Sequence, residues 1–78
     1  MSADASQARK DYQEALALAH ELGMRPLEAQ CHLALGELAS KTGNKQQARD
    51  QLTVAVRMFR EMGMQTWPEQ AESALKAL

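Results

Sequence analysis

The stretch LGELASKTGNKQQARDQLTVA, residues 35–55, decides the fold because it joins the end of one helical pattern to the start of the next. Gly43 lies just past the first pattern, where a left-handed helix end favours glycine. Asn44 can cap the helix that follows, with Gln47 three residues on. Because so short a connection forces neighbouring helices to run antiparallel, the stretch predicts a helical hairpin.

The chain repeats itself when it is shifted by 40 residues. The clearest matches are Glu21–Met24 with Glu61–Met64, Gln7–Arg9 with Gln47–Arg49, and Ala34–Leu35 with Ala74–Leu75. They extend over the full comparable length without a gap, and self-similarity at a fixed period is typical of repeat architectures. We therefore expect two copies of one helix-turn-helix unit.

Apolar residues spaced by three and four predict four amphipathic helices, over residues 4–22, 25–42, 45–62 and 65–78. The expected inward faces are Ala8, Tyr12, Ala15, Leu16, Ala19 and Leu22 in the first helix, Leu27, Cys31, Ala34, Leu35 and Leu38 in the second, Ala48, Leu52, Ala55, Val56, Phe59 and Met62 in the third, and Trp67, Ala71, Ala74, Leu75 and Leu78 in the fourth.

The residues expected at helix ends support this division. Gly23 and Gly63 follow helices as Gly43 does, and Asp4 and Thr66 are placed to cap the first and fourth helices. Pro26 and Pro68 fall near helix starts, where a missing N–H costs little. No alternating apolar pattern indicates a strand. The sequence therefore predicts an all-α fold of four antiparallel helices in a single domain over residues 1–78.

The spacing of six residues resembles the signature of the tetratricopeptide repeat (TPR) family: Leu35, Gly36, Gly43, Ala48, Leu52 and Ala55. The family's usual aromatic before Leu-Gly is His32 here, and its late proline is missing. The period of 40 exceeds the common period of about 34. This long-helix variant is similar to repeats at the ends of large bacterial regulators and nucleotide-cyclase-associated proteins. The resemblance implies a short right-handed solenoid of helical hairpins that binds proteins.

The phase of the repeat is shifted by half a unit, because the chain opens on a second-type helix and closes on a first-type helix. Repeat proteins need about three repeats to bury a continuous core. We therefore expect a homo-oligomer, with a dimer as the simplest case, or a part of a larger TPR array. The first helix lacks a preceding partner, so one side of its apolar face is expected to be uncovered.

Composition argues against several other classes of function. The net charge is −1, with nine basic and ten acidic residues, so nothing indicates strong attraction to a membrane or to nucleic acid. The N-terminal sequence is not a signal peptide, and the single cysteine, Cys31, demands no oxidising compartment, so we expect a cytoplasmic protein. His20, Cys31 and His32 lack the paired spacing of a metal site. The sequence shows no pattern that would place a nucleophile beside a general base, and it has no glycine-rich phosphate-binding loop. We therefore expect no enzyme activity and no cofactor.

The alternative function is that of a small helical DNA-binding regulator. It rests on the basic residues of the third predicted helix, which are Lys45, Arg49, Arg57 and Arg60. Helix-turn-helix proteins also place a basic helix after a short turn. Asp50 and Glu61 dilute this charge, however, and the helices are longer than such modules need.

The TPR resemblance implies that first-type helices line a concave groove. Its expected positions are Gln30, Leu33, Glu37 and Ser40, followed by Gln70, Ser73 and Ala77. From these we select Gln30, Leu33, Glu37, Gln70 and Ser73 as candidate protein-binding residues, against the other interpretation that they form plain solvated surface. The basic-plus-asparagine set that binds peptide carboxylates in co-chaperone TPRs is absent, so recognition of chaperone tails is not expected.

Overall fold

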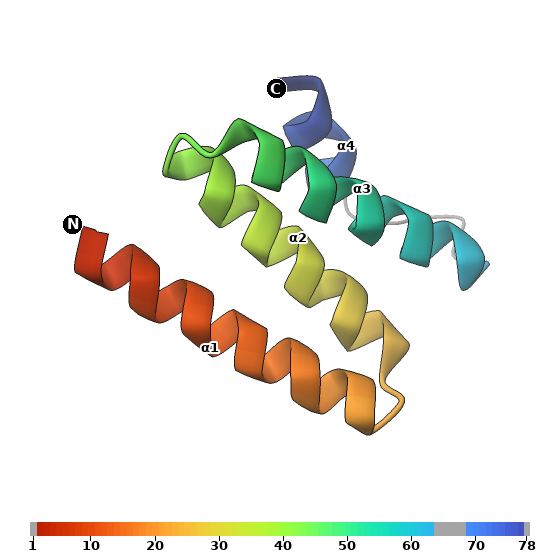
Figure 1. Cartoon of the computed structure of the whole chain (residues 1–78). Helices are drawn as coiled ribbons and strands as arrows, with labels where there is room; N and C mark the ends of the chain where they lie inside the picture. The colour runs from red at the N-terminus through yellow and green to blue at the C-terminus, as the bar shows by residue number, and fades with distance from the viewer. Residues whose placement is uncertain (1, 64–68, 78) are drawn as a thin grey trace.

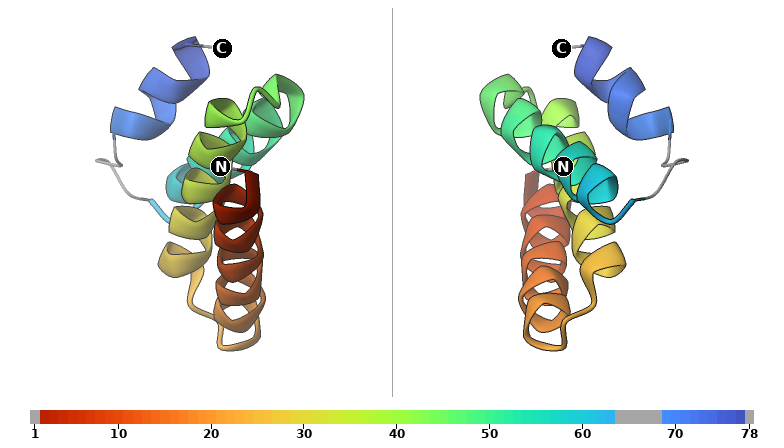
Figure 2. Two further views of the ribbon diagram at one scale, coloured as in Figure 1. Left: turned by 90° about the vertical axis from the view of Figure 1, so that its left-hand side faces the viewer. Right: turned by 90° about the vertical axis from the view of Figure 1, so that its right-hand side faces the viewer.

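The computed structural model describes residues 2–63 and 69–77, and within these ranges the chain forms helices and short turns with no strand. The helices are α1 (Ser2–Glu21), α2 (Arg25–Lys41), α3 (Lys45–Glu61) and α4 (Glu69–Ala77). The first three run antiparallel in succession, with α2 between α1 and α3 (Figure 1). The shorter α4 packs on α3 and lies to one side of the other three helices (Figure 2). The predicted all-α fold of helical hairpins is confirmed.

The helix ends differ from the prediction by small amounts. The helix α1 begins at Ser2, so Asp4 lies inside its first turn and the prediction that Asp4 caps it is wrong. Alanine at positions 3 and 5 favours helix strongly enough to continue the pattern past the expected cap. The helices α2 and α3 each end one residue early, at Lys41 and Glu61. The expected cap of the fourth helix, at Thr66 and Pro68, lies outside the described residues.

The turn between α2 and α3 has the geometry that glycine was expected to supply. Gly43 has φ of +82°, and the Asn44 N–H donates to the Ala39 carbonyl at 2.8 Å, as in a Schellman motif. The Asn44 side chain, however, makes no bond to a backbone N–H and instead donates from Nδ2 to Gln47 Oε1 at 3.0 Å. The glycine prediction is therefore confirmed, whereas the predicted capping box is wrong.

The core lies where α2, α3 and α4 meet. Its buried residues are Ala29 and Leu33 from α2, Leu52, Ala55, Val56, Met58 and Phe59 from α3, and Ala71 from α4. The α2 helix also buries Cys31, Leu35 and Ala39, which lie outside this cluster, so it is covered on more than one side. A helix between two neighbours has to bury more than one stripe, which explains why the single inward face predicted for it was too narrow.

Among the predicted inward residues of α2, Ala34 and Leu38 are half-buried and Leu27 is exposed. Leu27 lies in the first turn of α2 and stays 39% exposed, near the end of α1 where Leu22 is 63% exposed. The prediction that both residues face the core is therefore wrong. Leu22 lies in the connection between α1 and α2, Leu27 lies in the first helical turn after it, and no third helix of the described ranges covers this end (Figure 1).

Candidate protein-binding surfaces

The first surface is a row of apolar residues along α1 that the other described helices cover only in part. Leu18 is 56% exposed, whereas its repeat counterpart in α3, Met58, is only 8% exposed. Tyr12 is 40% exposed, whereas its counterpart Leu52 is fully buried. The difference arises because α3 contacts both α2 and α4, whereas α1 packs mainly on α2 (Figure 1). The half-buried Ala15, the exposed Leu18 and the exposed Leu22 just after the helix end follow one another at helical spacing, and we call these three residues the α1 stripe.

The second surface comprises the residues that were expected to line a concave groove. The structure shows that these residues differ in their exposure to solvent. Gln30 and Ser73 are exposed, and Glu37 is half-buried. Leu33 is only 5% exposed and packs within the core, so it is not available on the surface and the expectation that it lies away from the buried side is wrong. The side chain of Gln70 lies outside the described part of the chain. Of the selected candidates whose side chains are described, those that reach the surface are therefore polar.

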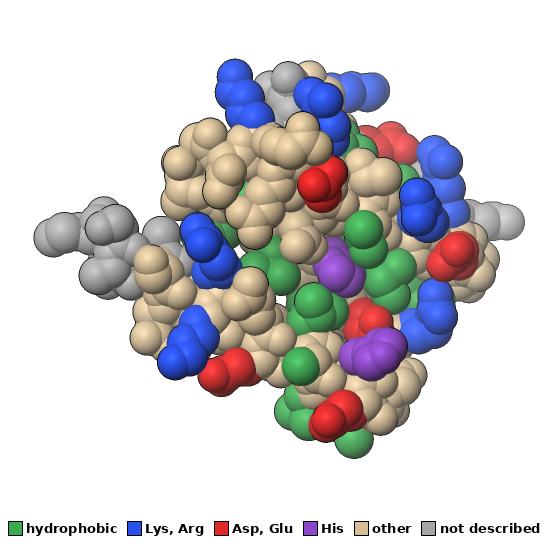
Figure 3. Space-filling model, in the orientation of Figure 1, with side chains coloured by type: hydrophobic (Ala, Val, Ile, Leu, Met, Phe, Trp, Pro, Cys, Tyr) green, Lys and Arg blue, Asp and Glu red, His purple; other side chains and the backbone are tan. Residues whose placement is uncertain are grey.

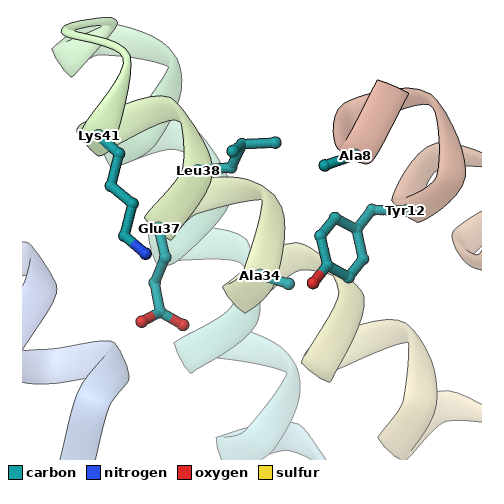
Figure 4. Close-up of a pocket in the computed structure, with 6 residues that line it drawn as sticks. All are labelled: Ala8, Tyr12, Ala34, Glu37, Leu38 and Lys41. Carbon is teal, nitrogen blue, oxygen red and sulfur yellow. The ribbon is translucent and has the colours of Figure 1, made fainter. Parts of the chain in front are cut away.

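A hollow of about 210 Å³ lies between the first half of α1 and the second half of α2. It is lined by Ala8, Tyr12, Ala34, Glu37, Leu38 and Lys41. Figure 4 shows the Tyr12 ring reaching from α1 toward Ala34, with Glu37 and Lys41 one turn apart on α2. Pockets for small molecules and cofactors have volumes of about 300–1,000 Å³. A hollow of this size has room for one large side chain of a protein partner. Sequence reasoning missed Lys41 and assigned Tyr12 to the core.

Both histidines have a neighbouring side chain within hydrogen-bond distance. His32 Nδ1 lies 2.6 Å from Gln51 Oε1, between α2 and α3, which supports its predicted role in helix packing. His20 Nδ1 lies 3.4 Å from Glu28 Oε2 at the surface. Among the described residues, no three histidine, cysteine or acidic side chains lie close enough together to hold a metal ion. This geometry gives the histidines packing and surface roles.

Charged side chains of both signs are interspersed on the face shown in Figure 3, where apolar side chains gather around the histidines. The basic residues Lys45, Arg49 and Arg57 are exposed on α3. Asp50 accepts a hydrogen bond from Gln46 Nε2 at 3.1 Å on the same helix, and Glu61 pairs with Arg25 at 3.2 Å. Acidic side chains therefore lie among the exposed basic ones of α3. In the described ranges, no helix combines the length and the apolar composition needed to cross a membrane.

Cys31 is buried on α2, as predicted, and burial together with the nearby carboxylate of Glu28 raises the pKa of its thiol. A raised pKa leaves a smaller thiolate fraction at any given pH, and the thiolate is the reactive form. We predict that a maleimide labels Cys31 at pH 7 at least about tenfold more slowly in the folded protein than in urea. Mass spectrometry of timed samples measures the two rates. Equal rates would show that the α1–α2 side of the fold opens freely.

Comparison with known families agrees with this architecture. The sequence profile of the tetratricopeptide repeat matches residues 3–61, which is more than half of the chain. The chain belongs to the tetratricopeptide repeat family. The match covers α1, α2 and α3 and ends before α4. Searches among curated proteins and among solved structures found no significant match. Membership of this family indicates a module for protein–protein interaction.

Proposed function

We propose that this TPR protein is a non-catalytic protein-interaction and self-assembly module that works in the cytoplasm. The observation that carries the proposal is the α1 stripe, where Leu18 and Leu22 are each more than half exposed although their positions belong to the packing face of the repeat. Contiguous exposed apolar residues mark interaction sites, because leaving them in water costs free energy that a partner surface removes. The concave side, with Gln30, Glu37 and Ser73, is the second candidate surface.

The hollow at Tyr12 supports the same function. Its lining combines apolar floor residues with a phenol, a carboxylate and an amine, which suits the side chains of a protein (Figure 4). Aromatic residues with a polar tip are enriched at protein interfaces because they offer apolar area and a hydrogen bond together. We therefore assign the hollow to a side chain of a protein partner.

Light scattering across a dilution series tests this proposal. We expect the weight-average mass to exceed that of one chain at about 500 micromolar and to fall toward it at about 5 micromolar, as for a weak association. Duplex DNA provides the control. Retention of DNA that weakens steeply as salt rises, with no change of mass in its absence, would contradict this proposal and favour a DNA-binding regulator.

A further inference from the structure

The contacts between α2 and α3 show what kind of helix suits this side of the repeat. The Arg25 guanidinium of α2 lies 3.2 Å from the Glu61 carboxylate of α3. Seven residues further along α2, His32 Nδ1 donates to Gln51 Oε1 at 2.6 Å, because an amide oxygen can only accept. Ala29 lies between these two residues of α2 and is fully buried in the core. The α2 helix therefore meets α3 with a basic residue, a small apolar residue and a hydrogen-bond donor in succession.

The corresponding side of α1 carries acidic residues. The repeat places Glu21 at the position of Glu61 and Asp11 at the position of Gln51. Both residues of α1 are exposed, and so is Glu14, which lies between them. Among the described residues, neither of these two glutamates of α1 pairs with a basic side chain. We call the α1 stripe together with Asp11, Glu14 and Glu21 the open face of α1.

The basic residues of α1 lie off this face. Lys10 corresponds to Asp50, which remains exposed on α3 although α2 covers the neighbouring positions. Arg9 corresponds to Arg49, which is exposed on α3 in the same way. The open face of α1 therefore combines exposed leucines with negative charge. Charge complementarity across an interface favours a basic partner for such a face.

The described helices of a second copy do not supply this combination of charge and apolar area. The side of α2 with the basic residue is occupied by α3, and α1 would bring acidic residues against acidic residues. The α4 helix carries Glu72 where α2 has His32. The exposed side of α3 is basic, but it has Thr53 between Arg49 and Arg57 and no exposed apolar residue to cover the leucines of α1. The open face therefore suits a helix from a different protein.

We propose that the open face of α1 binds a basic amphipathic helix of another protein, in the antiparallel orientation in which α2 packs on α3 (Figure 1). The inference rests on the protein-interaction part of the proposed function and specifies the chemistry of the partner. A partner arginine lies opposite Glu21, and a second basic residue seven positions later lies opposite Asp11. This spacing is that of Arg25 and His32 in α2. Apolar residues between them cover Leu18, which is 56% exposed without a partner.

A fluorescent peptide based on the sequence of α2 provides the probe. It comprises residues 25–41 with the substitutions Glu28→Lys, Cys31→Ala, His32→Arg and Glu37→Lys, so that its contact side carries two arginines seven residues apart. Fluorescence anisotropy with the full chain should show saturable binding with a Kd below about 100 micromolar. The Kd should rise as salt is added, because salt screens attraction between exposed charges.

Charge reversal locates the contact on α1. Glu21→Arg should raise the Kd at least about tenfold, and a second peptide that also carries Arg25→Glu should bind this variant more tightly than it binds the wild-type protein. Asp50→Arg makes the same change of net charge on the exposed side of α3 and should change the Kd of either peptide by less than about twofold. Leu18→Gln changes no charge and should raise the Kd of the first peptide at least about threefold. Circular dichroism should show the same helix content for all variants, because all three positions are exposed.

Peptide binding and light scattering together separate this inference from the proposed function. No binding at about 1 millimolar peptide, equal weakening by Glu21→Arg and Asp50→Arg, or a Kd that Leu18→Gln leaves unchanged would overturn the basic-helix contact. If the chain then still associates with itself and Glu21→Arg alters that association, the open face belongs to a second copy and the proposed function stands. A chain that stays monomeric and binds no peptide contradicts both. A monomeric chain that binds the peptide as expected supports this contact and contradicts only the self-assembly part of the proposed function.

Discussion

Replacing Phe59 by alanine is expected to lower the free energy of unfolding by about 3–5 kcal/mol. Phe59 is 1% exposed and is the largest fully buried side chain of the described residues. Its removal takes apolar area out of the core and leaves a cavity where α3 meets α2 and α4, which rigid helices close only in part. A chain of this length has a stability of roughly 4–12 kcal/mol. The variant should therefore lose a large share of its stability, and its thermal midpoint should fall well below that of the wild-type protein.

Urea denaturation followed by circular dichroism measures this effect, with Tyr12→Ala as the control. Tyr12 is also an aromatic residue on the repeat's packing face, but it is 40% exposed and lies at the hollow between α1 and α2. We expect its replacement to cost less than about 1 kcal/mol, as for most surface positions. Equal losses of unfolding free energy in the two variants would show that α1 is as tightly packed as α3. The description of α1 as only partly covered would then be wrong.

The fold was predictable from the sequence because local signals and the repeat agree. Gly43 ends a helix, its counterparts Gly23 and Gly63 recur at fixed spacing, and each adopts the positive φ that such an end requires. These signals involve few residues and depend little on tertiary packing. The side-chain cap at Asn44 was harder to predict. The Asn44 side chain bonds to the Gln47 side chain and not to a backbone N–H, and these two kinds of hydrogen bond differ little in energy.

The candidate site was predicted less well, because the exposure of a side chain depends on which helices pack against it. Leu18 and Met58 are both apolar residues at the same repeat position, but α3 packs on both α2 and α4, whereas α1 packs mainly on α2. The half-unit phase of the repeat predicts that part of the apolar face of the first helix is uncovered, and Leu18 and Leu22 are each more than half exposed. Leu33 was misplaced because a helix with neighbours on several sides has no single inward stripe to mark it.

Gly36→Ala is expected to destabilise the protein by about 1–3 kcal/mol, although alanine is the better helix former. The new β-carbon would lie 2.6 Å from Leu52 Cγ and 2.8 Å from its Cδ2, and the Ala48 carbonyl oxygen is 3.3 Å away. Leu52 is fully buried and cannot swing aside, so α2 and α3 must separate. Ala17→Gly is the control, because it makes the reverse substitution at an exposed position of α1 where helix propensity dominates. It should lower the free energy of unfolding by about 1 kcal/mol.

A double-mutant cycle with Leu52→Ala shows whether this clash is the cause. Removing the Leu52 branch leaves room for the added methyl group, so in that background Gly36→Ala should become neutral or stabilising. Leu52→Ala alone is expected to cost about 2–5 kcal/mol, so the four proteins are compared in an osmolyte that keeps all of them folded. If Gly36→Ala costs the same with and without the leucine branch, the loss comes from the backbone of α2. Gly36 would then not be the point that sets the distance between the paired helices.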